Sequence, residues 1–483
     1  MTNDVLKTVP LELYINGQWL PASDGGTFTV YNPANEEALA SVASATEADA
    51  LKAVDAAHRA GEAWQARAPR ERAEILRKAF ELMTERREAI AALISLEEGK
   101  TRAEALGEVA YAAEFFRWYA EEAVRDQGML ARSPAGANNI LVQHQPVGVC
   151  LLITPWNFPA AMGTRKIAPA LAAGCTTILK PASETPLTAL LLAGLLEEAG
   201  VPAGVVNVIP SKRSSVMSNS ILGDARVRKI SFTGSTEVGR LLLAKASERV
   251  VNCSMELGGN APFVVLDDAD MDVAIESALV AKMRNAGESC IGANRFYVHS
   301  SIIDEFSRRL AEQMGQLKVG HGLEQGVDVG PLVNASTRDK VAELVDQAVA
   351  QGATVLTGGE SISGKGFFYK PTVITNIPES ADICRTEIFG PVAAIYPFET
   401  IDEAVSKAND TEFGLAAYVI GRDVGRALAV ASRIDAGVMG INRGFVSDPA
   451  APFGGLKQSG IGREGSQDGL HEFIEKKYIA VDW

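Results

Sequence analysis

Residues 147–180 read VGVCLLITPWNFPAAMGTRKIAPALAAGCTTILK and decide the fold. Apolar runs at 148–154 and 176–179 predict two buried strands, and the segment between them predicts a helix at 160–173. Strands that are covered on both faces are continuously apolar, which is typical of parallel sheets with helices on each side. The stretch therefore predicts a βαβ unit.

The same alternation continues on both sides of a glycine-containing joint near Leu257-Gly258-Gly259. Further strands are expected before it at 205–209 and 228–232, with helices at 186–199 and 236–247. A second series starts with the run Pro262 to Leu266; it predicts helices near 271–286, 302–315, 335–350, 401–409 and 423–434, and strands near 354–357, 415–420 and 437–441. We predict an α/β fold of two doubly wound parallel-sheet domains, with the ligand at the carboxyl ends of the strands and between the domains.

Two regions lie outside this pattern. Residues 46–124 predict three long amphipathic helices, the first of them capped by Thr46 with Asp49. A polar stretch then leads to a short β excursion at 140–144. We assign 1–124 and 146–257 to a dinucleotide-binding domain, 258–455 to a catalytic domain, and 125–145 with 456–483 to a small β element for bridging or oligomerisation.

Composition excludes several classes of protein. The 483 residues are 47% hydrophobic and carry a net charge of −14, which disfavours nucleic acid and anionic membranes as partners. No apolar stretch approaches the length of a membrane span, and Met1 to Asp4 begin no targeting segment. The cysteines at 150, 175, 253, 290 and 384 show neither disulfide nor zinc-site spacing, so we expect a reducing cytoplasm and no metal.

Two residues have the character of a nucleophile and a base. Cys290 lies in a turn of small residues that leaves room for a substrate, although an isolated cysteine is more often a buried apolar residue. Glu256 ends the apolar run 250–255 against two glycines, where desolvation is expected to raise its pKa toward neutrality. A capping or domain-linking carboxylate is the alternative for Glu256.

Three further segments follow predicted strands. Asn157 comes directly after the first strand, where its amide can donate to an oxyanion or simply form a turn. Lys180 ends the next strand, where ribose and phosphates lie in open α/β sheets, although most lysines are ordinary surface residues. The glycine turn at 232–239 can present N–H groups to a pyrophosphate, but alone it is a weak signal.

Taken together, these motifs resemble the aldehyde dehydrogenase superfamily over essentially the whole chain. The matching motifs, in order, are TPWNFP at 154–159, LKPASETP at 179–186, FTGSTEVG at 232–239, MELGGN at 255–260, GESCIGANR at 287–295, EIFGP at 387–391 and PFGGLKQSG at 452–460. The resemblance implies that Cys290 attacks the aldehyde and that Glu256 activates the water that releases the acid. It also implies an oxyanion hole made by Asn157 and the Cys290 backbone N–H.

The resemblance further implies a set of residues around a bound NAD or NADP. Lys180 is expected to hold the adenine ribose, Gly234 and Ser235 to flank the pyrophosphate, and Glu387 with Phe389 to position the nicotinamide. The full set is Ile153, Thr154, Pro155, Trp156, Asn157, Lys180, Ser183, Phe232, Gly234, Ser235, Val238, Glu256, Leu257, Glu387 and Phe389.

Within the superfamily the chain is most similar to succinate-semialdehyde dehydrogenases and the related 2-oxoglutarate-semialdehyde enzymes. The resemblance places Arg165, Arg295 and Ser447 around the far carboxylate of the substrate, with Phe158 and Phe453 beside it. The planar arginine fork suits a carboxylate, but each arginine has an internal ion pair as its alternative. Succinate semialdehyde is therefore the expected substrate, and 2-oxoglutarate or glutarate semialdehyde is the alternative.

The choice of dinucleotide depends on Ser183. Members that prefer NAD often carry a glutamate there, and serine removes a negative charge that would repel a 2′-phosphate. Lys180, with Lys212 or Arg213, can attract that phosphate, although Arg213 is equally well explained as a solvated surface charge. We expect NADP, with NAD as the alternative, and the unusual turn at 210–213 leaves cofactor placement there open.

Two other functions compete with this prediction. An enzyme that transfers the acyl group to coenzyme A typically lacks the glutamate that Glu256 supplies, and a non-catalytic dinucleotide-binding protein has no need of Cys290. The resemblance also implies a homodimer or homotetramer, bridged by 125–145 and the strand Lys476 to Val481.

Overall fold

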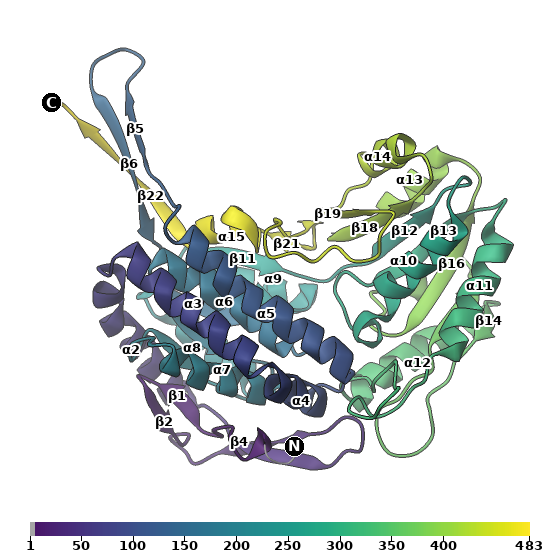
Figure 1. Ribbon diagram of the computed structural model, residues 1–483, viewed down its shortest axis with the longest axis horizontal. Helices are drawn as coiled ribbons and strands as arrows, with labels where there is room; N and C mark the ends of the chain where they lie inside the picture. Colours follow the sequence, from purple (N-terminus) through teal and green to yellow (C-terminus); the bar gives the residue numbers. More distant parts are fainter. Residues whose placement is uncertain (1–4) are drawn as a thin grey trace.

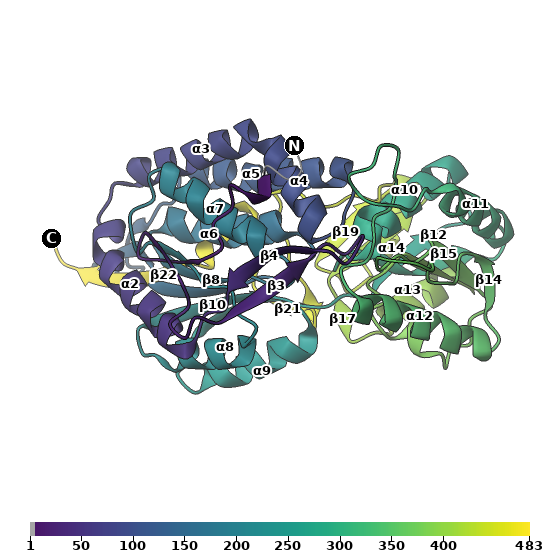
Figure 2. The same cartoon turned by 90° about the horizontal axis from the view of Figure 1, so that it is seen from below.

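Two parallel-strand sheets form the two domains of the computed structural model, which describes residues 5–483 (Figure 1). The first four residues, where the sequence predicts no targeting segment, lie outside the described residues. Seen from below, the domain built mainly from the first half of the chain and the domain of residues coloured green lie side by side (Figure 2). The predicted α/β class is confirmed.

The first sheet has the strand order β2-β1-β9-β8-β7-β10-β11-β21, in which β7 to β11 are parallel. Its strands are β1 (Leu13–Ile15), β2 (Gln18–Leu20), β7 (Val149–Ile153), β8 (Thr176–Lys180), β9 (Val206–Val208), β10 (Val227–Thr233), β11 (Asn252–Glu256) and β21 (Gly460–Ile461). The chain winds from β7 to β9 in one direction and from β10 to β11 in the other. The winding therefore reverses between β7 and β10, where open α/β sheets bind ligands at the carboxyl ends of their strands.

The second sheet has the order β14-β15-β16-β13-β12-β18-β19, and only β14 is antiparallel to its neighbour. Its strands are β12 (Ala261–Val265), β13 (Ala293–His299), β14 (Thr354–Thr357), β15 (Thr372–Thr375), β16 (Val392–Phe398), β18 (Ala416–Ile420) and β19 (Val438–Ile441). The sequence did not predict β13, β15 or β16. In β13, Asn294 and Arg295 interrupt the apolar run, which conceals a central strand.

Helices cover both sheets and mostly begin and end within a few residues of the predicted bounds, although the helix at 214–223 was not predicted. They are α6 (Pro159–Ala173), α7 (Pro186–Glu198), α8 (Ser214–Gly223), α9 (Thr236–Ser247), α10 (Met271–Met283), α11 (Ile303–Gln316), α12 (Ala335–Ala350), α13 (Ile401–Asn409) and α14 (Val424–Ala431). The helix predicted to reach residue 286 ends at Met283, and a kinked 3-10 turn follows at Arg284–Gly287. Because α10 ends early, a kinked turn rather than a continuous helix precedes Cys290.

Four helices, not three, occupy the region 46–124. They are α2 (Glu47–Gln65), α3 (Pro69–Glu85), α4 (Arg87–Glu97) and α5 (Arg102–Glu122). The predicted cap at Thr46 forms a capping box with Asp49, and a second capping box between Thr101 and Glu104 starts α5. Gly99, at φ +106°, ends the preceding helical path, because this backbone conformation is accessible mainly to glycine.

A three-stranded antiparallel sheet projects from the first domain (Figure 1). It contains β5 (Met129–Arg132), β6 (Asn139–Pro146) and β22 (Ile474–Val481), and β6 pairs with β22 along its whole length. The predicted β excursion at 140–144 is confirmed within β6. A hairpin of β3 (Thr27–Tyr31) and β4 (Ala38–Ala43) was not predicted. No helix in the described part of the chain combines the length and apolar character needed to cross a membrane.

Candidate active site

A cleft of about 1030 Å³ is lined by residues of both domains at the carboxyl ends of the first sheet. Most of the residues singled out from the sequence lie on its wall: Pro155, Trp156, Asn157, Phe158, Arg165, Gly234, Ser235, Glu256, Leu257, Cys290, Glu387, Phe389, Ser447 and Phe453. The cleft thus brings together segments that are separated by up to about 300 residues in the sequence.

Cys290 and Glu256 face this cleft together. Glu256 ends β11 and is buried, and neither of its carboxylate oxygens has a hydrogen-bond partner among the described residues. Burial raises the pKa of Glu256 to about 7; Glu464 adds to the rise and Arg165 opposes it. Burial also raises the pKa of the Cys290 thiol well above its usual range, and the nearby Glu256 charge raises it further. A carboxylate that titrates near neutrality beside a thiol is suited to take protons.

The segment before Cys290 has a left-handed backbone, and its close contacts with neighbouring segments require glycine. Asn285 and Ala286 have φ values of +55° and +51°, a conformation that costs about 1–2 kcal/mol for a residue with a Cβ atom. A Cβ atom on Gly287 would lie 2.1 Å from the Gly390 carbonyl oxygen, and one on Gly259 would lie 2.3 Å from that of Cys290. The two glycines therefore allow the Cys290 turn to approach both neighbouring segments.

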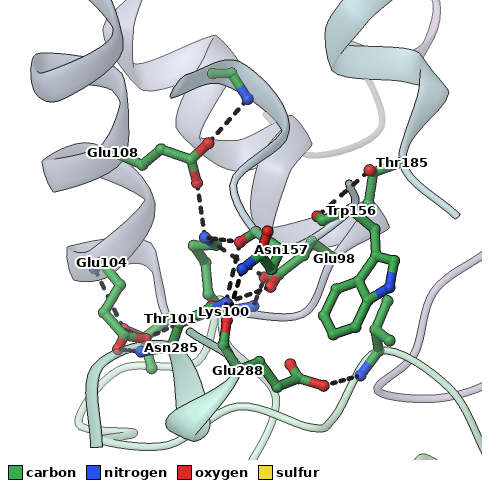
Figure 3. A network of polar contacts seen from close by, with 12 residues as sticks. Glu98, Lys100, Thr101, Glu104, Glu108, Trp156, Asn157, Thr185, Asn285 and Glu288 are labelled. Atoms are coloured by element: carbon green, nitrogen blue, oxygen red, sulfur yellow. Dashed lines mark hydrogen bonds and ion pairs between the residues drawn. The ribbon is translucent and has the colours of Figure 1, made fainter. Parts of the chain in front are cut away.

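Asn157 lies between β7 and α6 and is held from two sides (Figure 3). Its side-chain nitrogen donates to the Glu288 carbonyl at 3.0 Å, and its own carbonyl accepts from Lys100 at 2.7 Å and from the Asn285 amide at 3.0 Å. The amide nitrogen carries a second hydrogen, which is available to a ligand. The side-chain oxygen is buried without a partner in the described part of the chain.

A buried ion pair supports Asn157 from beneath. Lys100 lies 2.7 Å from Glu108 on α5, and the other Glu108 oxygen accepts from the backbone N–H groups of Ala160 and Ala161 at the start of α6 (Figure 3). A fully hydrogen-bonded buried network of this kind fixes one local geometry. The sequence did not predict this network, because Glu98 to Thr101 was interpreted as part of a continuous helical region.

Arg165, Arg284 and Ser447 form a polar wall of the cleft. Arg284 lies 3.2 Å from the Ser447 hydroxyl, between the rings of Phe158 and Phe445. Arg165, on α6, is ion-paired with Glu464 at 2.9 Å, yet its Nε and Nη2 atoms make no hydrogen bond of normal geometry to the described residues. Two guanidinium groups and a hydroxyl on one wall can bind a carboxylate.

Aromatic rings flank these two arginines. The Arg165 guanidinium lies 4.4 Å from the centre of the Phe453 ring, and that of Arg284 lies 4.7 Å from the centre of the Phe158 ring. Tyr111 on α5 also lines the cleft and was missed by the sequence analysis. Both guanidinium groups thus lie within cation–π distance of an aromatic ring of the cleft wall.

Arg295, proposed from the sequence as a carboxylate anchor, does not reach the cleft. It lies on β13, is fully buried, and donates to the backbone carbonyls of Asn260, Lys407 and Ala408. The prediction was wrong because the anchor position implied by the resemblance was carried onto Arg295, whose place in strand β13 was not recognised from the sequence. Arg284, six residues before Cys290, occupies the expected place instead.

A spacing signal for Arg284 was present in the sequence but ambiguous. Both Arg284 and Arg295 lie within six residues of Cys290, and only the backbone between them decides which faces the substrate. Had the apolar residues 296–298 been taken as a strand, Arg295 would have been expected beneath the site.

Predicted dinucleotide-binding residues lie in register along the ends of neighbouring strands. Ile153 pairs with Lys180 on one side and with Phe232 on the other, and Thr233 pairs with Glu256. Phe232 and Thr154 are buried, whereas Ser183 is half-buried and Val238 is exposed. Ile153, Thr154, Lys180, Ser183, Phe232 and Val238 do not line the cleft around Cys290, whereas Thr233 and Glu256 do.

Lys180 is a buried cation. Burial lowers its pKa to about 8; the charge of Glu184 opposes this shift and that of Lys212 adds to it. Ser183 donates to Glu184 at 3.1 Å, and Arg213 lies 3.6 Å from Asp24. Lys180 and Lys212 therefore act on the same region, whereas Arg213 has an acidic neighbour of its own.

The turn after β10 leads into the start of α9, where the first backbone N–H groups have no partner within the helix. Ser235 caps this helix by accepting from the Val238 N–H at 3.4 Å. A Cβ atom on Gly234 would lie 2.5 Å from the ring of Phe232, so glycine is needed there. Such a helix start favours an anionic group.

The opposite wall carries Glu387 and Phe389. Glu387 accepts from the Gly259 N–H at 3.0 Å, and burial raises its pKa to about 7. Phe389 meets Trp156 edge-on with 5.4 Å between ring centres. These contacts connect the second domain to the end of β7.

The residues present fit a nicotinamide dinucleotide. Polar atoms of Thr233, Glu256 and Asn157 face the cleft, buried and without partners among the described residues, and buried polar groups normally have partners. They lie beside the point where the winding of the first sheet reverses. Bound dinucleotide and substrate would supply what these atoms lack.

Comparisons with known proteins agree with this geometry. The aldehyde dehydrogenase family, compared as a sequence profile, matches residues 19–479. A succinate-semialdehyde dehydrogenase of Paenarthrobacter nicotinovorans is 55% identical over 92% of this chain and 98% of its own, and a glutarate-semialdehyde dehydrogenase of Pseudomonas putida is 46% identical over 97% of each. The crystal structure of an E. coli NADP-dependent enzyme superposes with a TM-score of 0.97 at 46% identity, covering 99% of both chains.

Proposed function

The chain belongs to the aldehyde dehydrogenase family, and from this premise we propose that it oxidises succinate semialdehyde to succinate with NADP as the hydride acceptor. The observation that carries the substrate assignment is the wall of Arg165, Arg284 and Ser447 in the same cleft as Cys290. An aldehyde with a carboxylate at its far end can reach both places at once.

Cys290 and Glu256 perform the chemistry of this chain. The Cys290 sulfur forms a bond to the aldehyde carbon as its proton leaves to a base, and the Asn157 amide with the Cys290 N–H holds the oxyanion. A nicotinamide dinucleotide, held by Lys180, Ser235 and Glu387, would supply the acceptor for the hydride that leaves the aldehyde carbon as the thioester forms. Glu256 then takes a proton from water, the oxygen adds to the thioester carbon, and the carbon–sulfur bond breaks to release the acid and the Cys290 thiol.

The polar wall of Arg165, Arg284 and Ser447 can bind the carboxylate of this substrate, which uncharged aldehydes lack. Hydrogen bonds to charged groups contribute about 1.5–3 kcal/mol each. Glutarate or 2-oxoglutarate semialdehyde is the alternative, because one additional methylene group or keto group changes the distance between the aldehyde and the carboxylate but not the charge. Transfer to coenzyme A is disfavoured by Glu256, which faces the cleft with unpartnered oxygens in the described chain and is placed to activate water.

NADP is favoured over NAD by the charges near Lys180. Ser183 places no carboxylate at this point, and Lys180 and Lys212 both act on it, although Glu184 reduces the positive charge. We expect kcat/KM to be higher with NADP than with NAD, and Ser183→Glu to shift this ratio toward NAD by roughly tenfold through repulsion of the 2′-phosphate. An unchanged ratio in this variant would assign the preference elsewhere.

Steady-state assays with succinate semialdehyde, glutarate semialdehyde and butanal test the substrate assignment. We expect kcat/KM for succinate semialdehyde to exceed that for butanal by about 100-fold, because butanal has the same chain length and no carboxylate. Similar values for the two C4 aldehydes would contradict the proposal. A higher value for glutarate semialdehyde would favour the alternative substrate.

The projecting sheet supports assembly into a homodimer or homotetramer. Met129, Leu130 and Tyr478 on this sheet are exposed apolar side chains, and exposed strand edges tend to pair with another chain. All five cysteines are free, which fits the cytoplasmic location expected from the sequence. Sedimentation of the purified protein would identify the oligomer.

A further inference from the structure

Three potential metal ligands meet at the base of the projecting sheet, away from the catalytic cleft. The side chains are Asp126, His144 and His471, and one ligand atom from each lies within 4.8 Å of the other two. Asp126 Oδ1 lies 2.6 Å from His144 Nδ1 and 3.7 Å from His471 Nε2. Asp126 and His144 line a different cavity from the one that contains Cys290.

The three residues come from separate segments of the chain. Asp126 lies between α5 and β5, His144 lies on β6, and His471 ends α15 (Ser466–His471) just before β22. The two strands β6 and β22 pair directly and carry the projecting sheet. Because no two of these ligands are near each other in sequence, the spacing of residues along the chain could not indicate the cluster.

An ordinary Asp–His hydrogen bond explains only part of this arrangement. It accounts for Asp126 and the Nδ1 atom of His144. It leaves His471 Nε2 buried, 3.7 Å from the carboxylate and without a hydrogen-bond partner among residues 5–483. A buried polar atom with no partner is unusual in a folded protein and indicates a missing ligand, such as an ion or a water.

We propose that Asp126, His144 and His471 bind a divalent transition metal ion of the Zn²⁺ class. Zn²⁺ binds imidazole nitrogen and carboxylate oxygen at about 2.0–2.2 Å, which places tetrahedral ligand atoms roughly 3.3 Å apart. The two distances to Asp126 lie on either side of this value. Two nitrogen ligands favour Zn²⁺ over Mg²⁺ or Ca²⁺, which prefer oxygen, and the adjoining cavity leaves a fourth position to water.

The positive charge of Arg72 lies near Asp126 but does not occupy the position proposed for the ion. Arg72 lies near enough to interact electrostatically with Asp126, but its guanidinium donates to the backbone carbonyls of Ala172 and Arg67. Arg72 therefore makes no hydrogen bond to Asp126 that would compete with an ion beside the two imidazoles.

The bound ion ties three segments together at the root of β6 and β22. A ligand that binds only the folded state stabilises it in proportion to the logarithm of its concentration over Kd. We expect Zn²⁺ to raise the Tm of the full-length protein and to reduce hydrogen exchange in β6 and β22. The ion takes no part in the reaction at Cys290.

A competition titration with a chromophoric zinc chelator tests the proposal. It is done with the full-length Cys290→Ser protein, so that the reactive thiol does not bind the added Zn²⁺. We expect one equivalent to bind, and His471→Gln or Asp126→Asn to weaken its affinity by at least about 100-fold, because even residues outside the first shell contribute 10–100-fold. His58→Gln, which removes an exposed histidine on α2, is the matched control and should bind as the parent does.

Co²⁺ distinguishes this site from a cysteine site. Bound by two imidazoles, a carboxylate and water, it should give visible d–d bands without a thiolate charge-transfer band. Circular dichroism shows whether each variant has folded, and Asp126→Asn retains the shape of the side chain. Absence of a bound equivalent, a thiolate band, or equal affinity in His471→Gln and His58→Gln would overturn the proposal.

Discussion

Arg284 and Arg295 lie on either side of Cys290 in the sequence, but the two regions of the fold that contain them give the guanidinium groups different hydrogen-bond partners. Arg284, in the kinked turn after α10, faces the cleft, and among residues 5–483 its side chain makes a single hydrogen bond, to Ser447. Arg295, on β13 in the second sheet, donates to three backbone carbonyls and to the Tyr297 hydroxyl. One arginine is available to a ligand, and the other is fully used by the fold.

This difference shows that closeness in sequence to the nucleophile does not decide function. Around the cleft, polar groups such as Glu256 and Asn157 carry atoms without partners in the described chain. Beneath it, buried groups such as Lys100 and Arg295 have their hydrogen bonds supplied by the protein.

Arg295→Met should act on stability rather than on substrate binding. It removes the guanidinium donors to the carbonyls of Asn260 and Ala408, at about 1–3 kcal/mol for each group left unsatisfied, whereas the Lys407 carbonyl still accepts from the Tyr297 hydroxyl and the Asp410 N–H. We expect the free energy of unfolding, measured in urea, to fall by about 3–5 kcal/mol. The KM of the folded fraction for succinate semialdehyde should change less than about twofold; a selective rise in KM would break the comparison.

Asn157→Ala should act on rate. It removes one donor to the oxyanion, which typically costs about 10²–10³ in kcat. Pre-steady-state measurement of NADPH formation should locate the loss in the step that forms the thioester. If Lys100→Met, which retains the amide but removes its support, caused no loss of rate, the buried network would have no positioning role.

Arg284→Met should act on affinity for the carboxylate. We expect KM for succinate semialdehyde to rise about 10–100-fold, since a hydrogen bond to a charged group contributes about 1.5–3 kcal/mol. The KM for butanal should stay within about twofold. Arg284→Lys, which keeps the charge but not the planar fork, should give an intermediate KM. An equal rise in KM for both aldehydes would show that Arg284 does not bind the carboxylate.

The pH dependence reports on Glu256, whose pKa burial raises to about 7. A general base must be ionised, so hydrolysis of the thioester should be constant above pH 7 and fall by about tenfold per pH unit below it. Single-turnover release of the acid at different pH values would measure this profile. A rate independent of pH between 5 and 8 would show that another group limits hydrolysis.

The alternating pattern was sufficient to predict most strands and helices, because buried parallel strands are continuous apolar runs. It failed where polar residues enter a central strand, as Asn294 and Arg295 do in β13. It also failed at Gly99 and Thr101, where a short turn divides two helices that are both amphipathic.

The residues of the candidate site were likewise predicted only in part from the sequence. Cys290, Glu256 and Asn157 were indicated by their positions beside strand ends and glycines, and by the family resemblance. The buried support from Lys100 and Glu108, and the orientation of Arg284, depend on contacts between distant segments and on a left-handed backbone at Asn285. No local pattern of residues specifies such contacts.

The central claim is that Cys290 carries a thioester that Glu256 hydrolyses. Mass spectrometry of Glu256→Gln protein, quenched after mixing with succinate semialdehyde and NADP, tests it most directly. We predict one succinyl group per chain, on the peptide that contains Cys290, and only a trace of it on the parent protein. An unmodified Cys290 after NADPH has formed, or a succinyl group on another residue, would contradict the account.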